Sequence, residues 1–276
     1  MLGDLHCHSI YSDGSVLPEQ LCKFALRHGL SHIALTDHDT LNGLSDLKAA
    51  AQKTELQIIP GVECTTKDPY TGRSVHVLCY APANPKLLLP LIQETSRKRR
   101  ESKLAMAEKI EKLYPLFKTE DCIFLARKST SIFESHIMRA LANAGYTNQP
   151  FGPLLKELIG KQGSCYVPIS YPNTLEVIDL MHQAGGIVVI AHPGQFDSVE
   201  LCLQLAKEQK IDGIECMHYK NSPEVQSKCL SIAEQYHLLI TGGSDFHGMY
   251  SASPHPVGFC TTDDLNMHRL LNLINV

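Results

Sequence analysis

A recurring unit of helix, short turn and apolar strand places the strongest limit on the fold of this chain. Three such units follow one another at residues 174–194, 199–218 and 223–247. Continuous apolar strands that alternate with helices are typical of a parallel sheet whose two faces are both buried. A chain of 276 residues with this many units is long enough for a single barrel. We therefore expect a barrel of the α/β class.

The N-terminal part of the chain shows the same alternation. The apolar spacing predicts helices at residues 18–28 and at about 42–53. Strands are expected at residues 32–39, 56–63 and 74–81, and the turn sequence DPYTGR separates the last two. These segments add strands to the same sheet.

The alternation stops in the middle of the chain. Residues 86–113, 135–143 and 152–160 have helical spacing, and no convincing strand lies among them. We interpret this part as a helical insertion into the barrel. It divides the chain into a barrel domain, residues 1–82 and 164–276, and an insertion domain, residues 83–163.

Composition excludes several classes of protein. A net charge of −4 gives no general basic signature for nucleic acid, so any polyanion site must be local. No apolar run approaches the roughly 20 residues that a membrane span needs. The chain is too long for a small disulfide scaffold and begins without a signal segment, so we expect its ten cysteines to be reduced thiols in the cytoplasm.

Ligand-type side chains stand where the apolar strands end. The residues concerned are His38, Glu63, His192, Asp245 and His247. In (β/α) barrels the carboxyl ends of the strands meet at one rim, and active sites are built there. We therefore expect these side chains to converge.

The stretch DLHCHSIYSDGS, residues 4–15, adds further ligand-type residues. In an extended strand His6 and His8 share one face, while Cys7 points to the other, where it is expected to be a packed core thiol. This geometry suits a metal held by imidazoles. An isolated pair of histidines is usually surface decoration, so the strand-end residues decide between the two interpretations.

The chemistry follows from the type and number of ligands. Imidazole nitrogen and carboxylate oxygen without thiolate suit Mn(II), Zn(II) or Fe(II), and nine plausible ligands exceed what one ion can use. We therefore expect two to three ions with Glu63 as a bridging ligand. Closely spaced ions activate a bridging hydroxide and hold both oxygens of a phosphoryl displacement. No Ser-His-Asp order, Walker loop or dinucleotide fingerprint competes with this interpretation.

Seven stretches resemble the PHP (polymerase and histidinol phosphatase) family, in particular its stand-alone phosphoesterase branch with a helical insertion. They are DLHCHSIYSDG, ALTDHDT, PGVE, VHVLCY, CYVPI, AGGIVVIAHPG and TGGSDFHG, and they cover most of the chain outside the insertion. The resemblance implies a distorted (β/α)7 barrel with a trinuclear metal site. It implies one ion at His6, His8, Glu63 and Asp245, a second at Glu63, His76 and His192, and a third at Asp13, His38 and His247.

The roles of individual residues follow from the same resemblance. From spacing alone His76 lies on a strand whose alternate residues can face the core, and the family pattern favours a ligand role. Asp4, Asp37 and Asp39 stand beside ligands, and we expect them to fix histidine tautomers. The ligands expected to take direct part in catalysis are Glu63, Asp13, His38 and His247.

One departure from the family pattern concerns the substrate. Related enzymes carry Arg-Pro-His at the start of a helix in the insertion, where this chain has Glu134-Ser135-His136. We expect His136 to contact substrate. The other candidates are Arg97, Arg100, Arg139 and Lys220, each of which could equally be a solvated surface cation.

The leading hypothesis is a metal-dependent phosphoesterase that hydrolyses phosphomonoesters of nucleotides, either nucleoside monophosphates or 3′,5′-bisphosphates. A 5′-3′ exonuclease acting on short RNA or DNA oligonucleotides is the first alternative. A non-catalytic metal-binding module and a hydrolase of C–N bonds are the others. We expect the partner to be a small phosphorylated substrate, a nucleotide or a short oligonucleotide, and we expect neither membrane binding nor a stable protein partner.

Overall fold

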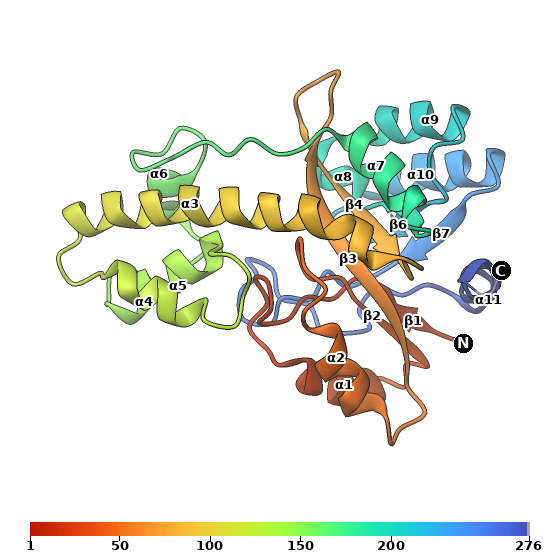
Figure 1. Ribbon diagram of the computed structural model, residues 1–276, viewed down its shortest axis with the longest axis horizontal. Coiled ribbons are helices and arrows are strands. Elements are labelled where there is room, and N and C mark those ends of the chain that lie inside the picture. Colours follow the sequence, from red (N-terminus) through yellow and green to blue (C-terminus); the bar gives the residue numbers. More distant parts are fainter. Residues whose placement is uncertain (275–276) are drawn as a thin grey trace.

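Seven strands form a single sheet that curls into a nearly closed barrel (Figure 1). The computed structural model describes residues 1–274. The strands lie side by side in chain order: β1 (Gly3–Asp4), β2 (His32–Leu35), β3 (Gln57–Lys67), β4 (Ser74–Tyr80), β5 (Ile187–Ile190), β6 (Gly213–Met217) and β7 (Leu239–Gly242). Backbone bonds from Leu5 N–H to the Gly242 carbonyl (3.2 Å) and from His8 N–H to the Phe246 carbonyl (2.9 Å) bring the first and last strands together.

Helices surround this barrel at the positions that the repeating units predict. They are α1 (Pro18–Arg27), α2 (Leu44–Ala51), α7 (Thr174–Gln183), α8 (Pro193–Phe196), α9 (Val199–Lys207), α10 (Pro223–Gln235) and α11 (Asp264–Ile274). Local chemistry fixes where some of them begin. Asn173 accepts a hydrogen bond from the Leu175 N–H at the start of α7, and Ser222 accepts one from the Val225 N–H at the start of α10.

The expectation of a parallel sheet is wrong for β4. This strand runs antiparallel to both β3 and β5, whereas the other neighbouring pairs are parallel. Only six residues, 68–73, join β3 to β4, and so short a connection closes a hairpin. The start of β4 therefore lies at the rim where the parallel strands end, and His76 is carried there.

The N-terminal strand is shorter than predicted. β1 covers only Gly3–Asp4, and Cys7 beyond it forms an isolated bridge with Phe246. Cys7 is fully buried in the apolar cluster that includes Leu21 of α1 and Leu47 of α2, as predicted for a core thiol. All ten cysteines are free thiols, and nine of them are buried.

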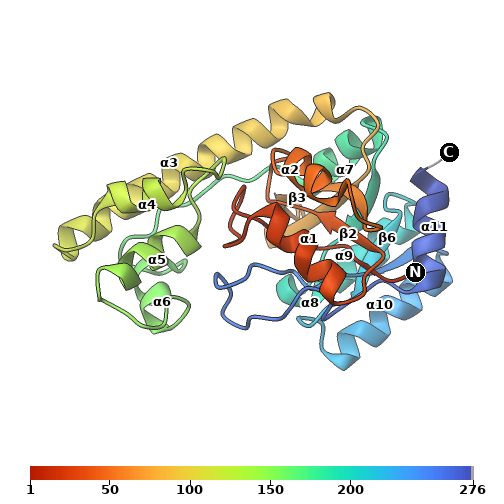
Figure 2. The same cartoon turned by 90° about the horizontal axis from the view of Figure 1, so that it is seen from below.

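The segment between β4 and α7 is helical, as predicted. It contains the short 3₁₀ helix η1 (Pro85–Leu88) and helices α3 (Leu89–Leu113), α4 (Thr119–Leu125), α5 (Glu134–Asn143) and α6 (Pro153–Ile159), of which α4 was not predicted. Figure 2 shows α4, α5 and α6 beside the far part of α3, to one side of the barrel. None of the helices in residues 1–274 has both the length and the apolar character of a membrane span.

The long helix α3 belongs to two apolar clusters. Ile92 near its start packs into the cluster of β3, β4 and α7. Met106 and Ile110 in its second half pack with Phe117 and Ile137 in a separate cluster. The division of the chain into a barrel and an insertion at residues 83–163 stays a proposal, and these two clusters support it.

A buried tyrosine links β4 to the segment that follows β1 inside the barrel. The Tyr80 hydroxyl donates a hydrogen bond to the Leu5 carbonyl at 2.9 Å, and both residues are fully buried among apolar side chains. A buried carbonyl that loses its donor costs about 1–3 kcal/mol.

We predict that Tyr80→Phe lowers the free energy of unfolding by about 1–3 kcal/mol. Urea denaturation of the metal-loaded protein measures this change. Tyr70→Phe is the matched control, because Tyr70 is largely exposed in the turn between β3 and β4 and should leave stability unchanged. Equal stability of the two variants would contradict the prediction.

Candidate metal centre

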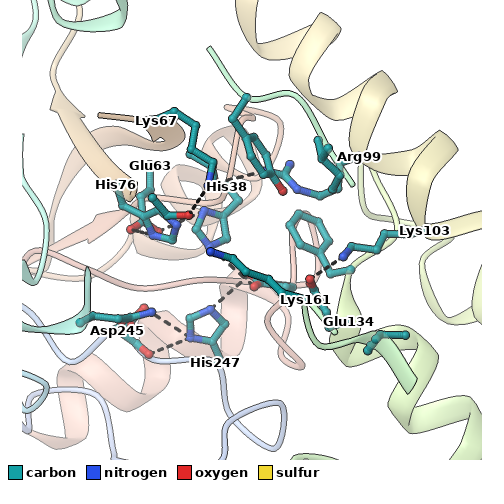
Figure 3. Close-up of a pocket in the computed structure, with 18 of the residues that line it drawn as sticks. His38, Glu63, Lys67, His76, Arg99, Lys103, Glu134, Lys161, Asp245 and His247 are labelled. Atoms are coloured by element: carbon teal, nitrogen blue, oxygen red, sulfur yellow. Dashed lines mark hydrogen bonds and ion pairs between the residues drawn. The ribbon is translucent and has the colours of Figure 1, made fainter. Parts of the chain in front are cut away.

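A cavity of about 420 Å³ opens at the rim of the barrel (Figure 3). Seven of the nine predicted ligands line it: Asp13, His38, Glu63, His76, His192, Asp245 and His247. The other two, His6 and His8, are fully buried beside them. The structure thus brings together all nine side chains from segments that lie far apart in the sequence.

Glu63 stands at the centre of this group and is fully buried. Its Oε1 lies 2.8 Å from His76 Nδ1 and 3.0 Å from His192 Nε2. Its Oε2 lies 3.2 Å from His6 Nε2, from His8 Nε2 and from His38 Nδ1. The two carboxylate oxygens therefore face two different sets of imidazoles.

Two aspartates complete the cluster on the other side of His8. Asp13 Oδ1 lies 3.3 Å from His247 Nε2 and 3.5 Å from His8 Nδ1. Asp245 Oδ1 lies 3.2 Å from His8 Nε2 and 3.6 Å from His6 Nε2. Four groups have ligand atoms within 4.8 Å of one another: His8, Asp13, His38 and His247; His6, His8, Glu63 and Asp245; His6, His192 and Glu215; and His38, Glu63 and His76.

Many polar atoms of this cluster are buried without a hydrogen bond. Among the residues that the structure describes, these atoms have no hydrogen-bond partner: His6 Nε2, both ring nitrogens of His8, His38 Nδ1, Glu63 Oε2 and His192 Nδ1. Buried polar atoms are nearly always paired in folded proteins, so such a concentration fits a site that holds cations. Nitrogen and carboxylate donors of this kind fit divalent transition-metal ions.

The charge of Glu63 fits the same conclusion. Burial by itself raises the pKa of this carboxyl group, but His38, His6 and His76 outweigh burial and hold the pKa well below its usual value. Glu63 is therefore ionised and available as a ligand through both oxygens.

Glu215 on β6 is a member of the site that the sequence analysis missed. It is fully buried, its Oε1 accepts a hydrogen bond from His6 Nδ1 (2.9 Å), and its Oε2 accepts one from the His192 backbone N–H (2.9 Å). Burial raises the pKa of Glu215, but the charges of His6 and His218 outweigh it and the net shift is downward. A carboxylate that holds one imidazole nitrogen leaves the other free for a metal. The sequence feature that could have identified Glu215 is its position in the apolar strand IDGIECMH.

The backbone is strained where two of the predicted ligands stand. His192 has a φ of 29° and Asp245 a φ of 47°, in the region that glycine normally occupies. Such conformations cost on the order of 1–3 kcal/mol each and are concentrated at functional sites. The bond from His192 N–H to Glu215 helps to hold one of them.

The three aspartates beside the ligands have a different role from the predicted one. We expected Asp4, Asp37 and Asp39 to fix histidine tautomers. Instead, Asp37 accepts hydrogen bonds from the Ser9 N–H and hydroxyl, both at 2.7 Å, and Asp4 accepts one from the Ser244 N–H at 2.9 Å. Asp39 forms a buried ion pair with Arg99 at 2.6 Å. These carboxylates hold the loops that carry the ligands, and not the imidazole rings.

His136, the predicted substrate contact, lies behind the cavity wall. Its side chain is buried, and its Nδ1 accepts a hydrogen bond from the Phe133 N–H at the start of α5. Burial lowers the pKa of His136 to about 4, although Asp13 opposes this shift. The neutral ring meets Tyr250 edge to face. Contact with substrate stays a prediction for His136.

The four predicted cations lie in different surroundings. Arg97 pairs with Glu94 and Glu101 on the exposed face of α3. Arg100 on α3 and Arg139 on α5 are half-buried. Lys220 lines a second cavity of about 300 Å³ that adjoins the metal centre. Four other cations line the first cavity: Lys67, Arg99, Lys103 and Lys161. Of these, only Arg99 belongs to the basic run from Arg97 to Arg100 that was expected to contact substrate.

The fold and the site together define an α/β barrel whose rim carries a histidine and carboxylate cluster able to hold metal ions. A family model described as PHP domain matches residues 4–153. The chain is 33% identical to the phosphoribosyl 1,2-cyclic phosphate 1,2-diphosphodiesterase of Eggerthella lenta, over 94% of this chain and 98% of that protein. The chain therefore belongs to the PHP domain family, and it is a metal-dependent phosphoesterase.

Other relatives show how the family varies. The chain is 29% identical to the 5′-3′ exoribonuclease Rnm of Escherichia coli, over 88% of this chain and 84% of that protein. It is 29% identical to the 3′,5′-nucleoside bisphosphate phosphatase of Chromobacterium violaceum, over 88% of this chain and 86% of that protein. A protein from Bifidobacterium adolescentis assigned as a metal-dependent phosphoesterase has a similar solved structure. Its TM-score is 0.89 at 30% identity, with 98% of this chain and 96% of that chain covered.

We predict that Glu215→Gln weakens metal binding about 10- to 100-fold. The amide has a single acceptor oxygen, so it cannot serve both His6 and the His192 N–H. Titration of the metal-free protein against a competing chelator measures the affinity. Glu200→Gln on the exposed face of α9 is the control. Wild-type affinity in the Glu215 variant would show that this carboxylate does not support the site.

Proposed function

We propose that the protein hydrolyses phosphomonoesters of nucleotides, with nucleoside monophosphates and 3′,5′-bisphosphates as the substrate class. Two to three ions of Mn(II), Zn(II) or Fe(II) are the proposed cofactors. The observation that carries the proposal is the position of Glu63, whose two buried oxygens face separate sets of imidazoles at the cavity. A carboxylate so placed suits a bridge between two ions.

The proposed ligand sets use the nine side chains at the rim. They are His6, His8, Glu63 and Asp245 for the first ion, Glu63, His76 and His192 for the second, and Asp13, His38 and His247 for the third. Short distances within each set support this assignment. Divalent ions at such a site supply charge stabilisation for a phosphoryl group and acidify water.

Two hydrogen-bond acceptors fix which ring nitrogen keeps its proton in His6 and in His247. Glu215 keeps a proton on His6 Nδ1, so His6 Nε2 is directed at Glu63 and Asp245. The Asp245 carbonyl accepts a hydrogen bond from His247 Nδ1 at 2.8 Å, so His247 Nε2 is directed at Asp13. When a metal binds, each ring would release the proton on Nε2, the nitrogen that faces the carboxylates of the cluster, because only the unprotonated nitrogen binds a metal.

The second cavity supports a nucleotide as the substrate. It shares Asp13, Asp245 and His247 with the metal centre. The side chains that it adds include Phe151, Leu155, Tyr219, Lys220 and Tyr250. Aromatic side chains beside a phosphate site can stack on a nucleobase, and such stacking contributes about 1–3 kcal/mol per base. By their names, two of the relatives act on a phosphorylated ribose and on a nucleoside bisphosphate.

The exonuclease is the second candidate, and the relationship to Rnm favours it. A long RNA requires a basic track along the surface, and binding that depends on such a track weakens steeply with salt. The net charge of −4 speaks against an extensive track. A non-catalytic module is disfavoured because all nine ligand positions carry metal-binding side chains.

A phosphate-release screen of the Mn(II)-loaded protein tests the proposal. We predict efficient hydrolysis of nucleoside monophosphates or 3′,5′-bisphosphates and little activity on long duplex nucleic acid. Generic aryl phosphates should be poorer substrates, because they lack the groups that bind away from the reacting phosphate. Efficient cleavage of long RNA with weak activity on mononucleotides would favour the exonuclease. No phosphate release from any substrate would favour the non-catalytic metal-binding module.

A further inference from the structure

A second group of charged side chains lines the cavity of the metal centre. Lys67 stands at the end of β3, Arg99 and Lys103 on α3, and Lys161 follows α6. In Figure 3, Lys67, Arg99 and Lys103 lie across the cavity from Asp245 and His247, and Lys161 extends between them. The cavity therefore has a cationic part beside the histidine cluster.

Two of these four cations are neutralised by carboxylates. Arg99 is buried, donates to Asp39 at 2.6 Å and to the Thr65 hydroxyl at 3.1 Å, and packs against the Phe133 ring. Lys103 is also buried and pairs with Glu134. These contacts fix both side chains in the wall of the cavity, and their charges are largely balanced.

Lys67 and Lys161 lack such a partner. Lys67 donates a hydrogen bond to the Ser74 hydroxyl at 3.0 Å. Within residues 1–274, no carboxylate lies within 4.0 Å of either ammonium group. Both lysines line the same cavity (Figure 3), and burial, and then repulsion by the charge of Lys161, lower the pKa of Lys67. An anion between them would relieve this repulsion.

We propose that Lys67 and Lys161 clamp a second phosphoryl group of the substrate, away from the one that reacts at the histidine cluster. This inference rests on the proposed function and narrows it to molecules that carry two phosphoryl groups. Arg99 offers a further donor, because its Nη1 has no hydrogen-bond partner among the described residues. A cavity of about 420 Å³ lies within the usual range for small-molecule sites.

The clamp joins the two parts of the chain. Lys67 belongs to the barrel, whereas Lys161 belongs to the helical segment between β4 and α7. A phosphoryl group held by both lysines fixes the substrate relative to the metal centre. Binding energy gained away from the reacting group is then available to orient that group for reaction. A substrate without the second phosphoryl group loses this contribution.

Steady-state kinetics with Lys161→Ala and Lys67→Gln tests the clamp. The substrates are a nucleoside 3′,5′-bisphosphate and the corresponding monophosphate. We expect each variant to lose about tenfold or more in kcat/KM for the bisphosphate, because each removes a charged hydrogen bond. Monophosphate hydrolysis should remain within about twofold of wild type. Lys161→Arg should retain the preference, and Lys156→Ala on the exposed face of α6 is the control.

A binding measurement separates the clamp from the chemistry. Inorganic phosphate is titrated into the metal-free protein and followed by phosphorus NMR. Wild type should bind phosphate, and both lysine variants should bind it at least about tenfold more weakly. Equal kinetic losses on both substrates, or phosphate binding that is independent of the lysines, would overturn the clamp. Lysine-dependent phosphate binding without hydrolysis of any nucleotide would support the clamp and contradict the proposed function.

Discussion

The buried carboxylate of Glu63 is the interaction on which the rest of the structure depends. An ionised carboxylate without solvent is very costly unless opposite charges and donors surround it. Five histidines lie within 3.2 Å of its oxygens. They come from the N-terminal segment, from β4 and from the loops that follow β2 and β5. The barrel must therefore bring these segments to one point, and a site for cations is the physical reason that the arrangement is tolerated.

Close backbone contact makes this convergence possible. A side chain added at Gly243 would place its Cβ 2.3 Å from the His6 Cβ, closer than two such atoms can approach. Only glycine allows the segment after β7 to lie against the N-terminal segment, where Leu5 and His8 form the bonds that draw the barrel together. The same approach brings Asp245 to His6 and His8. The contacts that close the barrel thus also bring part of the site together.

The sequence predicts most of the barrel because its periodic pattern is local. The helices and strands of the repeating units lie where their apolar spacing puts them. Apolar spacing does not specify strand direction, so β4 was expected to be parallel. The six-residue turn before it, which the sequence shows, requires a hairpin. The ligand-type residues at strand ends were identifiable for the same local reason. Their convergence, in contrast, requires the tertiary fold.

The residues that the sequence analysis did not identify depend on contacts that a local sequence pattern does not record. Four consecutive basic residues on α3 look alike in the sequence, and only the packing of the helix against the barrel turns Arg99 inward while Arg97 faces solvent. Glu215 has no motif of its own, and its contacts with His6 and His192 exist only across the barrel. Lys67 and Lys161 are separated in sequence by β4 and by most of the helical insertion. The metal centre was therefore more accessible to sequence reasoning than its supporting and substrate-facing residues.

The central claim is that Glu63 bridges two metal ions. Anomalous diffraction from crystals grown with Mn(II) tests it most directly, because the signal locates each ion without reference to activity. The account predicts two or three peaks in the rim cavity, with one peak beside each carboxylate oxygen of Glu63. A single peak, or several peaks of which fewer than two contact Glu63, would contradict it.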